Sequence, residues 1–218
     1  MLDAMAQFKG TRSVVVLPEL VADDELESLH ALGIGGLRVN IATAGTASLA
    51  AMRHDIGAAA RLAARHDWHV QIFVPSVVIE PLAPFLLALP VDTVIDHIGL
   101  IAPGPGTGAL RVLTRLLETG TIWVKISGAY RIADDWRDPR IRPLARALCA
   151  ANPERIVWGS DWPHTAKHDL RRPNSEEELP FQKIDTAALL TLVPHWLEDD
   201  ALVRRVLVDN PARLYDFS

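Results

Sequence analysis

The chain has 218 residues, with 22 Lys and Arg against 27 Asp and Glu, and 49% of its residues are hydrophobic. This length can bury one sizeable core, and the balance of apolar and charged residues excludes a disordered chain. The formal net charge of −5 argues against a nucleic-acid partner, because phosphate contacts need a basic surface.

The sequence carries neither a run of roughly 18 apolar residues that could span a membrane nor the basic and apolar segments of a signal peptide. Its single cysteine, Cys149, cannot form an internal disulfide, which suits a reducing compartment. We therefore expect a cytoplasmic protein without a membrane partner.

Six short β-rich runs alternate with helical patterns along the chain. The runs lie at 13–17, 36–40, 69–74, 93–97, 122–127 and 155–159, and the helical patterns at 22–32, 47–66, 109–119, 140–151 and 185–209, the last long enough for two helices. The runs are continuously apolar, which is typical of parallel strands covered on both faces. Gly33 and Gly120 predict the ends of two helices, and Asn210 with Pro211 predicts the N-cap and first residue of a final helical turn.

This alternation predicts an α/β fold with parallel strands. Two architectures fit, a TIM (β/α)8 barrel and an open doubly wound sheet, and both place function after the carboxyl ends of the strands. The first turn, Pro18-Glu19, lacks a glycine-rich phosphate cradle, and the glycine-rich segment 104–108 lacks a following Lys-Ser or Lys-Thr pair and reads as a loop. We therefore favour the barrel. A complete barrel takes about 250 residues, so the six runs indicate an incomplete barrel with six of eight strands.

The strongest candidate site follows the last run, in the segment Trp158-Gly-Ser-Asp-Trp-Pro-His164. Here an apolar strand ends in a carboxylate, Asp161, with an imidazole, His164, three residues later. A carboxylate beside a histidine can activate water as a general base or bind a divalent metal. The alternative makes Asp161 a helix N-cap and His164 a loop residue.

Further polar residues close other predicted strands. Asp96 and His97 end the run at 93–97, and strand alternation predicts that one points into the barrel and the other outward. An inward His97 could donate to a substrate carbonyl or ligate a metal, or it could simply bind a neighbouring backbone group. Arg38 lies inside a strand and needs an anionic partner, which could be Asp96 or a substrate carboxylate. Lys125, Ser127 and Arg131 surround the end of the fifth run.

Four motifs together resemble the amidohydrolase-related family of the amidohydrolase 2 type, in the branch typified by 2-pyrone-4,6-dicarboxylate lactonase. They are DHIG at 96–99, WVKISGAYR at 123–131, RIVWGSDWPH at 155–164 and NPARLYDF at 210–217. The resemblance implies a (β/α)8 barrel in which Asp161 is the general base for water and His97 lies near the scissile carbonyl. It also implies that Arg38 and Arg131 hold substrate carboxylates, with His164 as a further substrate-binding residue.

Members of this family normally begin with a strand that carries a His-x-His pair, and no such pair occurs here. We therefore expect residues 1–218 to form a single barrel domain that lacks its first two βα units. Its exposed strand edges would favour a homo-oligomer. If the full-length protein binds a divalent metal such as zinc, His97 and Asp161 are the expected ligands, although a zinc site usually takes three or four.

The expected activity is that of a hydrolase that opens a lactone or similar cyclic ester of a small, carboxylated molecule by Asp-activated water. Two alternatives stay open at this point. One is a metal-dependent decarboxylase or amide hydrolase on the same barrel, because fold and motif do not determine reaction class. The other is a non-catalytic, degenerate fragment.

Overall fold

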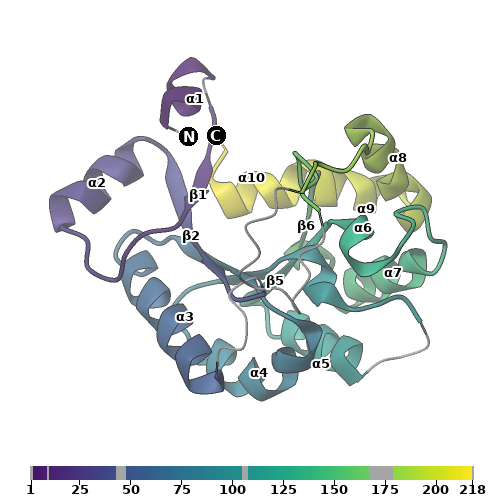
Figure 1. The fold of residues 1–218 in the computed structure, drawn as a ribbon, viewed down its shortest axis with the longest axis horizontal. Coiled ribbons are helices and arrows are strands. Elements are labelled where there is room, and N and C mark those ends of the chain that lie inside the picture. The colour runs from purple at the N-terminus through teal and green to yellow at the C-terminus, as the bar shows by residue number, and fades with distance from the viewer. Residues whose placement is uncertain (1, 9, 43–47, 105–107, 167–178, 218) are drawn as a thin grey trace.

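The computed structural model describes residues 2–8, 10–42, 48–104, 108–166 and 179–217. Within these ranges six parallel strands form one sheet (Figure 1). They are β1 (Ser13–Val15), β2 (Ile34–Asn40), β3 (His69–Phe73), β4 (Thr93–Ile95), β5 (Ile122–Ser127) and β6 (Ile156–Gly159). Each strand pairs with the next one along the chain, from β1 to β6. A doubly wound sheet would reverse its strand order at a switch point, so the sheet is a curled half-barrel, and the prediction of an incomplete barrel is confirmed.

Helices connect successive strands and cover the outer face of this half-barrel (Figure 1). They are α1 (Leu2–Gln7), α2 (Asp23–Ala31), α3 (Leu49–Ala63), α4 (Ile79–Leu87), α5 (Gly108–Glu118), α6 (Ala129–Ile132), α7 (Ile141–Ala151), α8 (Thr186–Leu197), α9 (Asp200–Arg204) and α10 (Asn210–Tyr215). The side chain of Ser48 accepts a hydrogen bond from the Ala51 amide and so begins α3 at its N-cap. The buried side chains Met52 and Ile56 then turn one face of this helix toward β2 and β3.

One helix was missed, and one local prediction was wrong. The segment 79–87 was not predicted as a helix, because Pro81 and Pro84 interrupt its pattern; Pro84 lies inside α4, where it supplies no amide donor. Asn210 does not cap the last helix, since Arg205–Asp209 forms a π-helical turn that runs directly into α10. The buried Asn210 amide instead donates to the carbonyls of Pro153 and Ile156, which ties α10 to the start of β6.

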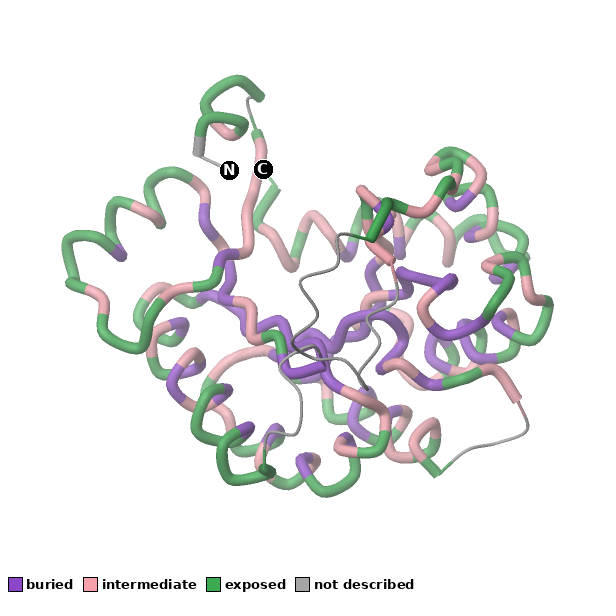
Figure 2. The backbone as a smooth tube through the Cα atoms, in the orientation of Figure 1, coloured by how far each residue is buried: buried purple, intermediate pink, exposed green. Residues whose placement is uncertain are grey.

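The two faces of the sheet differ in polarity. The outer face is apolar, and side chains such as Val70, Ile72 and Val124 are buried in the hydrophobic core. Figure 2 shows that the buried parts of the chain gather along the central strands, whereas exposed segments lie on the surrounding helices. The inner face carries polar side chains on alternate residues, including Arg38, Gln71 and Lys125. The prediction of strands that are apolar on both faces was therefore wrong for the inner face, which is where a barrel builds its site.

The two ends of the chain lie close together beside β1 (Figure 1), where Arg12 donates to the carbonyl of Asp216. Within the described ranges, no helix is both long enough and apolar enough to cross a membrane. Most of the predicted loop at 104–108, namely residues 105–107, lies outside the described residues.

Candidate active site

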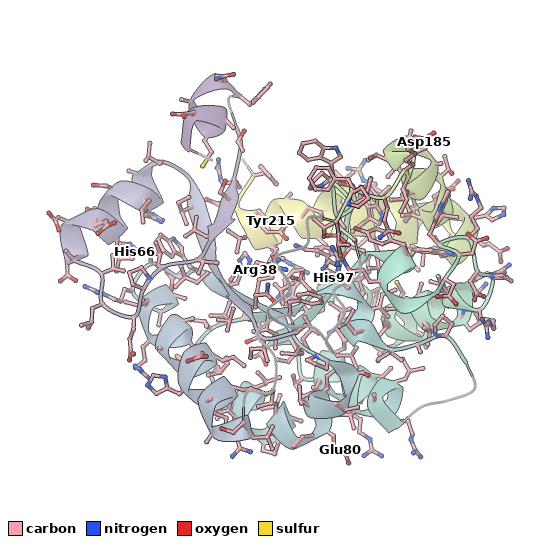
Figure 3. All side chains as sticks on the ribbon, in the orientation of Figure 1. Arg38, His66, Glu80, His97, Asp185 and Tyr215 are labelled. Atoms are coloured by element: carbon pink, nitrogen blue, oxygen red, sulfur yellow. The ribbon has the colours of Figure 1, made fainter. Side chains whose placement is uncertain are left out.

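Neighbouring strand ends bring the predicted catalytic residues together. His97 follows β4, Arg131 lies in α6 directly after β5, and Asp161 follows β6. Because the three strands are parallel neighbours, these segments meet at the carboxyl edge of the sheet. Arg38, on β2, reaches the same region, and Figure 3 shows Arg38 and His97 in the central part of the molecule.

Asp161 is held by two donors through one of its carboxylate oxygens. The Tyr130 hydroxyl donates to Oδ2 at 2.6 Å, and Nε of Arg131 donates to the same atom at 2.5 Å. The other oxygen, Oδ1, lies 3.8 Å from Nε2 of His97. The alternative role of Asp161 as a helix N-cap is wrong, because its carboxylate accepts from two side chains and a turn follows it.

His97 is fixed from both sides of its ring. Its Nδ1 lies 2.9 Å from the hydroxyl of Ser127, and the ring packs edge-on against Phe73, with centroids 4.9 Å apart. Only 4% of His97 is exposed, and Asp96 is also buried and faces the inner side of the sheet. The prediction that Asp96 and His97 point in opposite directions was therefore wrong. Strand β4 ends at Ile95, and His97 has a φ of 52°, so strand alternation no longer applies.

Both candidate catalytic residues have an uncommon backbone conformation. Asp161 has a φ of 59°, which like that of His97 lies in the left-handed region. Such conformations cost free energy for non-glycine residues and cluster at functional sites. Gly128 provides the space between them, because a Cβ there would lie 2.8 Å from Nδ1 of His97 and 3.1 Å from Oδ2 of Asp161.

The environment sets the charge of the two residues. Burial lowers the pKa of His97 to about 4, and the carboxylates of Asp96 and Asp161 oppose this shift without reversing it. The imidazole is therefore neutral at pH 7. Burial alone would raise the pKa of Asp161, but its electrostatic interaction with His97 and the hydrogen bonds from Arg131 and Tyr130 lower it below the usual value. Asp161 is therefore a carboxylate at neutral pH.

Arg38 belongs to a second charged cluster, deeper on the inner face. Its Nε and Nη2 both donate to Oδ2 of Asp96, at 3.3 and 3.1 Å. The Gln71 amide donates to the same oxygen at 3.0 Å, and Nζ of Lys125 donates to the Gln71 carbonyl at 2.8 Å. Lys125 also lies 3.7 Å from Oδ1 of Asp96. Of the two partners that the sequence left open for Arg38, Asp96 is the one it contacts.

The ring of Phe73 lies near both predicted arginines. The guanidinium of Arg38 lies 5.6 Å from the centroid of Phe73, and that of Arg131 lies 5.8 Å from it. Arg131 also donates to the hydroxyl of Thr165 at 2.8 Å. Both arginines thus contact internal carboxylates, and their contact with a substrate stays a prediction.

His164 lies beside this group rather than within it. Its Nε2 is 2.9 Å from the Thr186 hydroxyl, and its ring packs edge-on against Tyr130, with centroids 5.7 Å apart. Only 3% of His164 is exposed. Its predicted contact with substrate therefore also stays a prediction.

Sequence reasoning missed several residues of the site: Phe73, Tyr130, Gln71, and the roles of Ser127 and Gly128. Tyr130 and Gly128 lie within the WVKISGAYR motif, next to the predicted Arg131, so position in that motif was an available signal. Phe73 and Gln71 occupy alternate positions of β3, and only strand register shows that they face the site.

The described residues do not form a metal site by themselves. Within the described ranges, no three His, Cys, Asp or Glu side chains are placed to hold one metal ion. His97 and Asp161 would supply two ligands, whereas a catalytic zinc usually has three from the protein. Oδ2 of Asp161 is moreover already bound by Arg131 and Tyr130.

A curled parallel sheet with its polar groups at the carboxyl edge is the architecture of a barrel enzyme. The chain belongs to the amidohydrolase family, whose model matches residues 1–217. It is similar to a 4-sulfomuconolactone hydrolase of Hydrogenophaga intermedia, with 36% identity over 68% of this chain and 47% of that protein. It is also similar to a 2-pyrone-4,6-dicarboxylate hydrolase of Comamonas testosteroni, with 29% identity over 99% of this chain and 70% of that protein.

A solved structure has the same fold. An apo structure from Agrobacterium tumefaciens matches all of this chain and 74% of its own, with a TM-score of 0.80 and 26% identity. The chain spans about half the length of the Hydrogenophaga relative that it matches.

Proposed function

We propose that this chain carries the hydrolytic site of a lactone hydrolase that acts on small, anionic cyclic esters. The observation that carries the proposal is the pairing of an ionised carboxylate with a neutral imidazole, since Oδ1 of Asp161 lies 3.8 Å from Nε2 of His97. The names of the two relatives support the substrate class, because both compounds are cyclic esters with carboxylate or sulfonate groups.

In the proposed reaction Asp161 is the general base. A water molecule attacks the ester carbonyl carbon and gives a proton to Asp161 while its C–O bond forms. The ring C–O bond then breaks, and the proton passes to the oxygen that leaves. An alkoxide leaving group gives a hydroxy acid, whereas the enolate released from a 2-pyrone gives an enol that becomes a keto acid. Tyr130 and Arg131 hold Oδ2, which orients Oδ1 toward His97 and the reacting atoms.

His97 is proposed to stabilise the negative charge on the carbonyl oxygen. If the Ser127 hydroxyl donates to Nδ1, the neutral ring carries its proton on Nε2. This N–H can then donate to the developing oxyanion, in a buried site where such a bond is strong. The packing of Phe73 and Gly128 against the ring keeps it in place.

The charge of the inner face supports an anionic substrate. Among the described side chains at this end of the sheet, three cations (Arg38, Lys125 and Arg131) surround two carboxylates (Asp96 and Asp161). The excess positive charge favours binding of a carboxylate or sulfonate, and arginine can bind such groups through two parallel hydrogen bonds. We propose that Arg38 and Arg131 recognise these groups, with His164 as a further substrate-binding residue.

The test is hydrolysis of 2-pyrone-4,6-dicarboxylate by the wild type and by Asp161→Asn. The amide keeps the shape of the side chain but cannot take the proton, so kcat should fall by about 10²–10⁴-fold. Asp55→Asn, which removes an exposed carboxylate from α3, should leave kcat unchanged. Circular dichroism would show that each variant is folded. A folded Asp161→Asn protein that hydrolyses the lactone at the wild-type rate would refute the role of Asp161.

A further inference from the structure

Lys125 and Asp96 contribute to the charge of the inner face, but the proposed reaction gives neither of them a direct contact with the substrate. Asp96 is 1% exposed, so its carboxylate needs a cation nearby. It has two. Arg38 binds Oδ2, while Lys125 lies 3.7 Å from Oδ1, an oxygen without a hydrogen bond inside the described part of the chain.

The two cations differ in position. The side chain of Arg38 is 30% exposed and lies on the open side of the cluster, whereas that of Lys125 is 17% exposed. Gln71 links the two ends, because its amide donates to Asp96 and its carbonyl accepts from Lys125. Lys125 is therefore held beside Asp96 independently of Arg38.

We propose that Lys125 is a reserve counter-ion that allows Arg38 to leave Asp96 and bind the anionic group of the substrate. This inference rests on the proposed function, in which Arg38 recognises that group. When Arg38 turns toward the substrate, Asp96 would lose its main partner while still buried, and such a loss is strongly unfavourable. Lys125 needs to move its ammonium by only a short distance to hydrogen-bond Oδ1, because the present separation exceeds that of a hydrogen bond by less than 1 Å.

Without Lys125, Arg38 is the sole cation for Asp96 and cannot be released at low cost. The affinity for an anionic substrate should then fall, although Arg38 itself is intact. A neutral substrate, which does not recruit Arg38, should bind as before. Lys125 is thus a positioning residue that determines specificity, and the selectivity between charged and uncharged ligands is its signature.

The experiment compares 2-pyrone-4,6-dicarboxylate with its dimethyl ester in the wild type, Lys125→Met and Lys125→Arg. For Lys125→Met we expect KM for the dicarboxylate to rise about tenfold, the size of one lost charge-assisted contact, and KM for the ester to change less than about twofold. Lys125→Arg should restore most of the selectivity. Arg115→Met, which removes a positive charge from the exposed surface of α5, controls for net charge and should leave both KM values unchanged. Equal losses for both substrates would overturn the proposal.

The same comparison in a protein that already carries Asp96→Asn distinguishes a reserve counter-ion from a residue that binds the substrate directly. In Asp96→Asn there is no carboxylate to compensate, so adding Lys125→Met should not change the selectivity further. This double variant also removes both charges of the pair, which protects folding if Lys125→Met alone is unstable. A renewed, dicarboxylate-specific loss in this background would show that Lys125 contacts the substrate itself, and the reserve role would be refuted.

Binding without turnover separates this inference from the proposed function. Isophthalate is a planar dicarboxylate that cannot be hydrolysed, and isophthalamide is its uncharged counterpart. Calorimetry should show Lys125→Met weakening isophthalate about tenfold and isophthalamide little. If the wild type hydrolyses no lactone but this pattern holds, the proposed reaction fails and the role of Lys125 stands. If lactones are hydrolysed but Lys125→Met binds isophthalate like the wild type, the role of Lys125 fails alone.

Discussion

Replacement of His69 should change the pH dependence of stability. His69 lies on the inner side of β3, 3% exposed, with its ring against Gly36 of β2 and the edge of Tyr215 of α10. Figure 3 labels Tyr215, on the C-terminal helix. Burial lowers the pKa of His69 from 6.5 to about 4, and the positive charge of Lys125 adds to the shift, while Asp96 opposes it.

The sign and size of the effect follow from this shift. Between pH 6.5 and pH 4 the unfolded chain binds a proton at His69 that the folded protein excludes, so protonation favours unfolding. The stabilisation is fully present above pH 6.5 and is lost as the pH falls toward 4. Each pKa unit corresponds to about 1.4 kcal/mol, so the wild type should lose about 3 kcal/mol through His69 between pH 7 and pH 4.

The assay is urea unfolding, followed by circular dichroism, at several pH values between 7 and 4. His97 and the carboxylates also titrate in this range, so the useful quantity is the difference between the wild type and His69→Leu. His69→Leu should lose about 3 kcal/mol less than the wild type over this range. His195→Leu, which removes an exposed histidine from α8, should follow the wild type. Parallel pH profiles for His69→Leu and the wild type would refute the reasoning.

Two further predictions concern the candidate active site. Arg38→Met should raise KM for 2-pyrone-4,6-dicarboxylate at least tenfold more than KM for its dimethyl ester. Arg131→Met should also lower kcat for both compounds, because Arg131 orients Asp161. Steady-state kinetics on both substrates would check this, and equal effects of Arg38→Met on the two KM values would make that arginine structural. Gly128→Ala should lower kcat and destabilise the fold by about 1–2 kcal/mol, because Gly128 has a φ of 58° and the added Cβ would lie 2.8 Å from Nδ1 of His97. Steady-state kinetics and urea unfolding would measure the two effects, and wild-type values in both would contradict the prediction.

The elements that sequence predicted well are those whose signal is local. The order of six parallel strands followed from apolar runs and helical patterns, and the structure places strands in all six runs. Gly33 and Gly120, with φ values of 93° and 84°, end α2 and α5 as expected, because few other residues adopt this conformation. The helix α4 was missed since its prolines mask a pattern that tertiary packing stabilises.

Several residues of the candidate site were predictable, whereas the sequence named a possible partner for Arg38 alone and could not decide it. Asp161, His97 and Arg131 were singled out from motifs at strand ends, and the structure brings these three together. That Arg131 contacts Asp161, and Arg38 contacts Asp96, depends on how the strands and their following segments are placed in space. Sequence spacing contains no information on that placement until the strand order and register are known.

One signal of the inner face was nevertheless present in the strand sequences. In IGGLRVN, HVQIF and IWVKIS, the side chains that face the barrel interior are every second residue, and these include Arg38, Gln71 and Lys125. Where helices cover one face of a strand and the other face lines a site, apolar and polar side chains are expected to alternate along the strand. A polar residue at the inward position is stable only if a neighbouring strand supplies its partner. The inward polar residues are paired in this way, and both carboxylates, which follow the ends of β4 and β6, also find cations on other elements. Asp96 contacts cations from β2 and β5, and Asp161 contacts Arg131. Polar residues at alternate positions of successive parallel strands therefore indicate a charged cluster even where no single motif is specific, and the excess of cations over carboxylates in that cluster is the basis for proposing an anionic ligand.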